Sequence, residues 1–212
     1  MLLAVDAAQE ESRVQTRSFS SMVVATTALA ALFSGRNWRV LSNLPERLER
    51  LTQTSADTVD RLGGDLSITQ FVFLGSGALY GLACEAMLKM TEMAKLFSVA
   101  YQPLEYLHGP RYAADSHTQL IALVSESARD EERRALDTLR QHGIPLLTLA
   151  ESNLVPPIDG DAITLASGVP EWGRAILYLP PLQRICWLQA VNRGFDPDNL
   201  AYVPNRPQGQ MP

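Results

Sequence analysis

The sequence has few of the residues that build metal centres and disulfide frameworks. Its 212 residues include two cysteines and three histidines, and these are scattered without metal-ligand spacing. Cys84 and Cys186 both lie in apolar surroundings, which is typical of buried thiols rather than of a disulfide pair. The sequence therefore predicts no metal and no disulfide, and it favours a reducing, cytoplasmic compartment.

Basic residues and long apolar runs are also scarce. Lys and Arg number 18 against 23 Asp and Glu, so the formal net charge is -5. Binding to nucleic acid needs clustered Lys and Arg, and the local basic runs, such as Arg133-Arg134, are short. No apolar run has the length of a membrane span, and Met1–Asp6 lacks the basic start of a signal peptide. We therefore expect neither nucleic-acid nor membrane partners.

Apolar runs that alternate with helical segments indicate the fold class. Hydrophobic residues make up 46% of the chain, enough for a sizeable core. Strands that are apolar throughout are typical of a parallel sheet covered on both faces. The predicted fold is a three-layer α/β/α sandwich with a flavodoxin- or Rossmann-like sheet. Its predicted strands are Phe71–Leu74, Ser98–Tyr101, Leu120–Val124, Pro145–Ala150 and Ala162–Leu165, and a further short strand is expected at Leu2–Val5.

Helices are expected before, between and after these strands. We expect a loop over Pro103–Pro110 and a kink near Pro180-Pro181 in the last helix. The predicted helices are Phe19–Phe33, Leu44–Leu62, Leu79–Leu96, Glu131–His142 and Ala175–Arg193.

A glycine-rich turn follows the first of the five apolar strands. Ligands of parallel sheets bind at the carboxyl ends of the strands, here Gly75-Ser76-Gly77, Tyr101–His108 and Ser125–Ser127. The turn does not match a dinucleotide fingerprint, because Gly81 follows Gly77 by four residues rather than three. No cofactor is therefore predicted. The turn is either a cradle for an anion or a tight strand-to-helix connection without a ligand.

Three charged residues share one face of the helix that follows. Glu85, Lys89 and Glu92 are spaced i, i+4 and i+7. Such a line is either a solvated salt-bridge ladder or a carboxylate base held beside a lysine. A base of this kind is what proton transfer between adjacent sugar carbons requires.

One histidine stands in a distinctive context. His108 precedes Gly109-Pro110, where a helix could begin. Its imidazole could open a sugar ring by moving protons between oxygens, or it could simply cap or pack. His117 and His142 have no such context, and we interpret them as structural.

Together these motifs resemble the sugar isomerase (SIS) family. Their order and spacing are similar to those of the second SIS domain in the isomerase half of glucosamine-6-phosphate synthase. They also resemble AgaS-type ketose/aldose isomerases and amino-sugar deglycases. Glu11–Phe19 resembles the end of the family's first SIS domain, and Asp196–Ala201 resembles the C-terminal loop that closes over the sugar.

The resemblance implies roles for individual residues. Glu92 would move the proton between C1 and C2, with Lys89 and Glu85 as its companions on the helix face. His108 would open the ring, and in the family it is supplied to the partner's site across a homodimer interface. The segment Val14, Gln15 and Thr16 would contact the sugar.

Two departures from the family pattern limit which roles of the family's residues and domains can be expected in this chain. Tyr202 stands where the synthase loop has a Schiff-base lysine, so the imine step is not expected to transfer. Most of the first SIS domain and the whole glutaminase domain are missing, so this chain alone would not transfer ammonia from glutamine. We expect a first-domain remnant and helical connector at 1–65, a SIS domain at 66–203 and a disordered tail at 204–212.

The resemblance thus implies an isomerase-type enzyme acting on a phosphorylated sugar or amino sugar, with or without amination or deamination. The chain would be the C-terminal portion of a two-SIS enzyme. The alternatives are a non-catalytic SIS module that binds a sugar phosphate, and an inactive truncated product.

Overall fold

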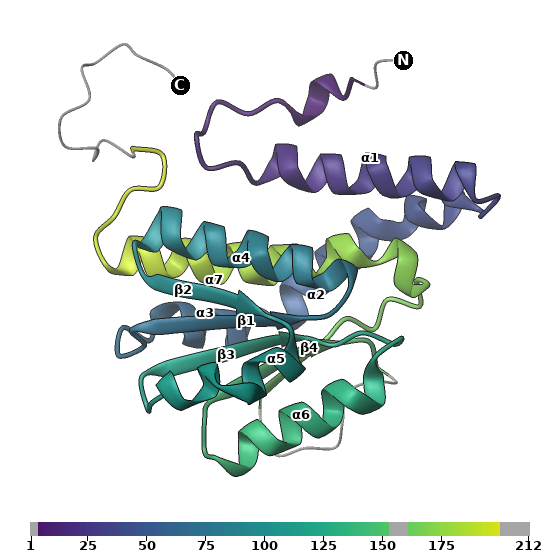
Figure 1. Cartoon of the computed structure of the whole chain (residues 1–212). Helices are drawn as coiled ribbons and strands as arrows, with labels where there is room; N and C mark the ends of the chain where they lie inside the picture. Colours follow the sequence, from purple (N-terminus) through teal and green to yellow (C-terminus); the bar gives the residue numbers. More distant parts are fainter. Residues whose placement is uncertain (1–3, 153–160, 200–212) are drawn as a thin grey trace.

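The centre of the molecule is a five-stranded parallel sheet (Figure 1). The structure is a computed structural model that describes residues 4–152 and 161–199. The strand order is β2-β1-β3-β4-β5, and all four pairings are parallel. The strands are β1 (Gln70–Gly75), β2 (Phe97–Tyr101), β3 (Thr118–Leu123), β4 (Leu146–Ala150) and β5 (Asp161–Thr164). The fold class predicted from the sequence is confirmed, and its five strands are present within one residue at most ends.

Alternating side chains of β1 separate two helical layers. Phe71 and Phe73 point into a core shared with α4 and α7, whereas Val72 and Leu74 point into a second core shared with α5 and α6. Figure 1 shows α4 and α7 on one side of the sheet and α5 and α6 on the other. The helices are α1 (Arg17–Phe33), α2 (Leu44–Thr54), α3 (Ala56–Gly64), α4 (Ala78–Ala94), α5 (Pro103–His108), α6 (Arg129–Gln141) and α7 (Leu179–Asn192). Short 3-10 helices lie at η1 (Asp6–Ala8), η2 (Trp38–Asn43), η3 (Pro110–Ala113), η4 (Glu171–Gly173) and η5 (Ala175–Tyr178).

The helices that precede the sheet contribute to its first core. Leu44 and Leu51 of α2, with Val59 and Leu62 of α3, are buried in the same cluster as Phe71. The division of the chain at residues 65 and 66 stays a prediction, and the predicted tail at 204–212 lies outside the described residues.

Three local predictions differ from the structure. The expected loop over Pro103–Pro110 is wrong, because Pro103 begins α5 where its missing N–H is not needed. The helix predicted over Leu44–Leu62 divides at Ser55, whose hydroxyl donates to the Leu51 carbonyl at 2.7 Å. The predicted kink at Pro180-Pro181 is instead the first turn of α7, which follows η5.

The described residues of the strand expected at Leu2–Val5 do not form a strand. Ala4 and Val5 are exposed and belong to no strand, and residues 1–3 lie outside the described part.

The turn from β1 to α4 depends on the absence of a side chain at Gly75. A Cβ there would lie 2.6 Å from the carbonyl oxygen of Leu79, in the first turn of α4. We expect Gly75→Ala to lower the free energy of unfolding by about 1–3 kcal/mol, because backbone atoms must move apart. Gly64→Ala is the matched control, since a Cβ at Gly64 meets nothing within 4 Å. Urea unfolding of both variants checks this, and equal effects would contradict it.

Candidate functional site

The charged line on α4 is mostly buried rather than solvated. The side chains of Glu85 and Lys89 are 7% and 4% exposed, and that of Glu92 is 34% exposed. The Lys89 ammonium lies 3.3 Å from Glu85 Oε1 and donates a hydrogen bond to Glu92 Oε2 at 3.0 Å. A surface ladder would leave all three in water. The burial therefore favours the second interpretation, a carboxylate held beside a lysine at the edge of the core.

Burial raises the pKa of Glu85, and the nearby Lys89 only partly offsets this effect. Glu85 Oε1 lies within ion-pair distance of Lys89 but has no hydrogen bond of its own. The Lys89 ammonium forms ion pairs with both Glu85 and Glu92, and its hydrogen bond is to Glu92. The arrangement therefore contains one buried carboxyl with a raised pKa, that of Glu85, and one carboxyl that is partly open to solvent, that of Glu92.

A pH dependence of stability follows from the raised pKa of Glu85. The unfolded chain releases this proton near the ordinary value of 4.5, before the folded protein does. The free energy of unfolding should therefore fall as pH rises from about 4.5 through the raised pKa, and level off above it. We expect Glu85→Gln to reduce this slope in urea unfolding at a series of pH values. Glu46→Gln, at an exposed position in α2, should leave the slope unchanged; an unaltered slope in Glu85→Gln would refute the assignment.

His108 lies in the other layer of the molecule. It is the last residue of α5, whose Tyr106 packs in the core of Val72 and Leu74, away from α4. The structure therefore does not bring His108 together with Glu92 in one chain. Its ring makes no hydrogen bond in the described structure, unlike the rings of His117 and His142, which bond to the carbonyls of Ser67 and Thr138. The interpretation of those two histidines as structural agrees with these bonds.

The segment before α1 is held by a residue that the sequence prediction missed. The Glu10 carboxylate accepts backbone N–H bonds from Thr16 at 2.8 Å, Arg17 at 3.0 Å and Ser18 at 3.1 Å. Burial opposes ionisation of Glu10, but the hydrogen bond from the Ser18 hydroxyl at 2.6 Å, together with these backbone bonds, outweighs it and lowers the pKa of Glu10. The cap comes from six to eight residues upstream, so the local spacing of capping motifs could not reveal it.

This cap fixes the predicted sugar-contacting segment at the N-terminus of α1. Val14 is buried, Thr16 is half-buried and Gln15 is exposed. Gln15 is thus available to a ligand, whereas Val14 belongs to the same core cluster as Met90 and Met93 of α4. The side chain of Ser20 on α1 contacts that of Gln183 on α7 at 3.5 Å, so α1 begins over the α4–α7 layer (Figure 1). Tyr202 lies outside the described residues.

Carboxylates of the chain itself occupy the loop that follows β3. Glu132 accepts the backbone N–H of Ser125 at 2.8 Å, and Glu171 accepts that of Glu126 at 2.7 Å. Burial raises the pKa of Glu132, and its bonds to Ser125 and Ser76 only partly offset this. The donors at this carboxyl end therefore already have acceptors, which favours a structural turn over an anion cradle for Ser125–Ser127.

The turn Gly75-Ser76-Gly77 lies beside that loop, because β1 and β3 are neighbours. Gly77 has a φ of 55°, which favours glycine, and the carbonyls of Ser76 and Gly77 accept the N–H groups of Leu79 and Tyr80. A ligand role for these three residues stays a prediction.

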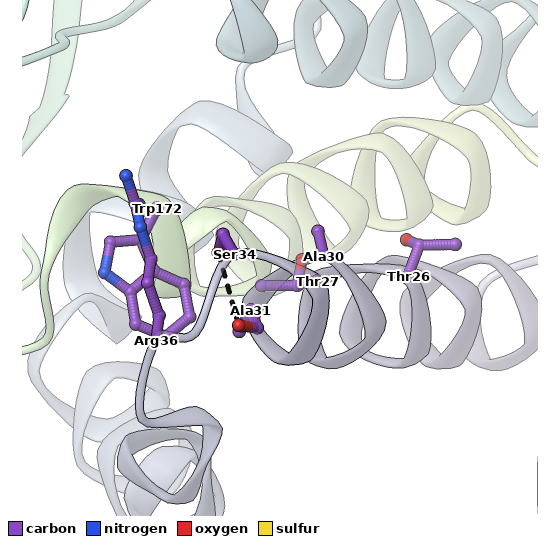
Figure 2. A pocket seen from close by; sticks show the side chains of 7 residues that line it. All are labelled: Thr26, Thr27, Ala30, Ala31, Ser34, Arg36 and Trp172. Carbon is purple, nitrogen blue, oxygen red and sulfur yellow. Dashed lines mark hydrogen bonds between the residues drawn. The ribbon is translucent and has the colours of Figure 1, made fainter.

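Other parts of the described surface offer no better site. No group of His, Cys, Asp and Glu within residues 4–152 and 161–199 could hold a metal ion. A hollow between α1 and η4 is lined by residues that include Arg36 and Trp172, with the guanidinium 5.6 Å from the ring centroid (Figure 2). None of the predicted site residues lines it. No helix of the described structure is long and apolar enough to cross a membrane.

Known proteins with similar sequences act on phosphorylated sugars. The glutamine–fructose-6-phosphate aminotransferase (isomerizing) of Legionella pneumophila is 27% identical over 195 residues, 88% of this chain and 32% of the relative. The D-galactosamine-6-phosphate deaminase AgaS of a Shewanella species is 29% identical over 201 residues, 92% of this chain and 48% of the relative. No protein-family model matches the chain. The chain thus spans about a third of the first of these curated relatives and about half of the second.

Solved structures show the same fold. Tagatose-6-phosphate ketose/aldose isomerase from Escherichia coli has a TM-score of 0.80 at 22% identity, covering 99% of this chain and 58% of that one. Glucosamine-6-phosphate deaminase from Thermotoga maritima has a TM-score of 0.71 at 27% identity, covering 92% of this chain and 58% of that one. The family resemblance predicted from the motifs is therefore confirmed.

Proposed function

We propose that this chain, a sugar isomerase (SIS) domain by sequence and fold, acts on a phosphorylated sugar or amino sugar as part of an aldose–ketose isomerase. The observation that carries the proposal is the Glu85–Lys89–Glu92 line, with a buried ammonium 3.0 Å from a carboxylate that is one-third exposed. This arrangement presents a base to solvent while fixing its position. The names of the relatives, which are isomerases, deaminases and aminotransferases of sugar phosphates, support the substrate class.

In the proposed mechanism Glu92 moves one proton between neighbouring carbons. Its carboxylate removes the proton from C2 of the open-chain aldose, and the electron pair passes to the carbonyl oxygen O1, which takes a proton from solvent to give an enediol. The ammonium of Lys89, 3.0 Å from Glu92, would lie beside the developing charge on O1 and would stabilise it. Glu92 then returns the proton to C1 while the hydroxyl on C2 releases its proton to solvent and becomes the carbonyl, which completes the ketose. General-base catalysis of this kind contributes about 10²–10⁴-fold to the rate.

His108 would open the sugar ring in the site of a second copy. Because α5 and α4 lie on different sides of the sheet, the proposal assigns the His108 and the Glu92 of one site to two different copies. A cytoplasmic homodimer in which each copy lends His108 to the other satisfies this geometry. Gln15 and Thr16 at the start of α1 would contact the sugar, and Tyr202 would belong to the segment that covers it.

A second candidate is a SIS module that binds the sugar phosphate without turning it over. The location of His108 and Glu92 on different faces of the sheet favours it, because one chain then holds only part of the proposed catalytic machinery. The donors of the Ser125–Ser127 loop already have acceptors, so for either candidate the phosphate contacts would come from elsewhere.

Thermal unfolding in the presence of fructose 6-phosphate, glucosamine 6-phosphate and related sugars tests the proposal. A ligand that binds only the folded chain must raise the melting temperature. We expect a rise with one phosphosugar and a smaller or no rise with its unphosphorylated form. An isomerase assay on that sugar then separates the enzyme from the binding module. A well-folded chain that responds to none of them contradicts both.

A further inference from the structure

Both carboxylate oxygens of Glu10 accept hydrogen bonds from the start of α1. Oε1 accepts the backbone N–H of Thr16 and that of Ser18, and Oε2 accepts the backbone N–H of Arg17. The hydroxyls of Thr16 and Ser18 add bonds to Oε2 at 3.3 Å and to Oε1 at 2.6 Å. The lowered pKa of Glu10 keeps it ionised at neutral pH. Because an ionised carboxylate can only accept hydrogen bonds, all of these partners must be donors.

The carboxylate thereby fixes the direction of two hydroxyl protons. The protons of the Thr16 and Ser18 hydroxyls point at Glu10, which leaves the lone pairs of both hydroxyl oxygens for other partners. Both side chains are half-buried rather than enclosed. A group that approaches these oxygens from solvent therefore meets acceptors and must itself donate. A sugar hydroxyl can donate in this way, whereas an ionised phosphate oxygen cannot.

The same segment is anchored in the layer that carries Glu92. Val14, two residues before Thr16, is 2% exposed. It belongs to the core cluster that contains Met90 and Met93, which precede and follow Glu92 on α4. The segment is thus held by the core at Val14 and by the Glu10 carboxylate at Thr16, so its hydroxyl oxygens have fixed positions beside that layer.

We propose that Glu10 determines the specificity of this segment, because it turns the Thr16 and Ser18 hydroxyls into acceptors for the hydroxyl groups of the sugar. Glu10 is a positioning residue, since it acts through Thr16 and Ser18 and does not itself touch the sugar. The inference rests on the proposed function for the presence of a sugar. It adds which part of that sugar the segment recognises, namely hydroxyl groups and not the phosphate.

Glu10→Gln tests this role at nearly constant shape. The amide has one accepting oxygen and one donating nitrogen, so in either orientation its nitrogen meets a backbone N–H that had an acceptor. The amide nitrogen also donates to a hydroxyl oxygen and turns the hydroxyl proton outward. We expect the dissociation constant and the KM of the phosphosugar to rise about tenfold, with kcat within about twofold of the wild type.

Glu11→Gln is the matched control, because Glu11 is the exposed neighbour and makes none of these contacts. Titration calorimetry of the wild type and both variants, with the phosphosugar identified by thermal unfolding, measures affinity. Amide hydrogen exchange at Thr16, Arg17 and Ser18 measures the contacts of Glu10 without any sugar. Exchange should be slow in the wild type and in Glu11→Gln, and faster in Glu10→Gln.

Deoxy analogues of the phosphosugar separate specificity from a general loss of structure. Removing the hydroxyl that donates to Thr16 or Ser18 should weaken binding to the wild type about tenfold, and should change binding to Glu10→Gln much less. The inference is overturned by fast exchange in the wild type, by equal effects of Glu10→Gln and Glu11→Gln on affinity, or by deoxy analogues that affect the wild type and Glu10→Gln alike. A wild-type chain that binds no phosphosugar contradicts the proposed function as well, whereas sugar binding that is independent of Glu10 contradicts this inference alone.

Discussion

Mixing the Glu92→Gln and His108→Ala variants is expected to restore about a quarter of the wild-type isomerase activity, although each variant alone should be inactive. In a mixed dimer one site carries both lesions and the other carries neither. Random exchange makes about half of the dimers mixed, and each of these has one intact site of two. The recovery follows from the location of Glu92 and His108 in different layers of the sandwich.

The assay is turnover of the phosphosugar identified by thermal unfolding, after the two variants are incubated together to exchange subunits. Glu92→Gln alone should still bind that sugar, because the amide keeps the shape of the carboxyl and loses only the base. The control mixture pairs Glu92→Gln with Glu85→Gln, which lie on the same helix and cannot complement each other. No recovery in the first mixture, with both variants folded and dimeric, would show that His108 does not serve a neighbouring site.

Arg174→Ala is expected to lower the free energy of unfolding by about 3–5 kcal/mol, the largest loss from any single ion pair described. Arg174 is 1% exposed. Its Nη1 lies 2.6 Å from Glu126 Oε1 and 3.3 Å from the Val169 carbonyl, and 4.0 Å from Glu151 Oε2. Burial opposes the ionisation of Glu151, but bonds from Ser167 and Ser152 and the charge of Arg174 lower its pKa. Removing the guanidinium leaves that buried carboxylate without its cation.

Arg184→Ala is the control for this loss. Arg184 forms an ion pair of similar length with Asp60, 2.8 Å, but its side chain is 42% exposed and that of Asp60 is 52% exposed. Water screens such a pair, so its removal should cost below about 1 kcal/mol. Urea unfolding at neutral pH measures both variants against the wild type. Similar losses in the two variants would mean that burial does not determine how much the Arg174 contacts contribute to the free energy of unfolding.

Several features could be predicted from the order of residues alone. Five strands apolar throughout require two covered faces, and that requirement predicts the three-layer sandwich without reference to any distant contact. The spacing of Glu85, Lys89 and Glu92 places them on one helix face by the period of the helix. The order and spacing of the motifs from Gly75 to Pro110 resemble those of the SIS family, and the similarity to known sequences confirms this resemblance. None of these conclusions requires the positions of other elements.

Other features depended on which elements pack together. Sequence spacing could not distinguish a solvated line of Glu85, Lys89 and Glu92 from a buried one. Lys89 is buried because α4 packs against both the sheet and α7, where Cys186 lies nearby. Sequence order placed His108 sixteen residues after Glu92, but the chain enters β2 between them and crosses to the other face of the sheet. The occupation of the Ser125–Ser127 loop by Glu171 joins residues that are far apart in the chain, and the cap of α1 by Glu10 spans six to eight residues, beyond the spacing of local capping motifs. Local pattern determines which helices and strands form and which face of each is apolar, because these depend on neighbouring residues. Burial, charge pairing and the separation of the two proposed catalytic groups depend on tertiary packing, because water is excluded only where distant segments meet.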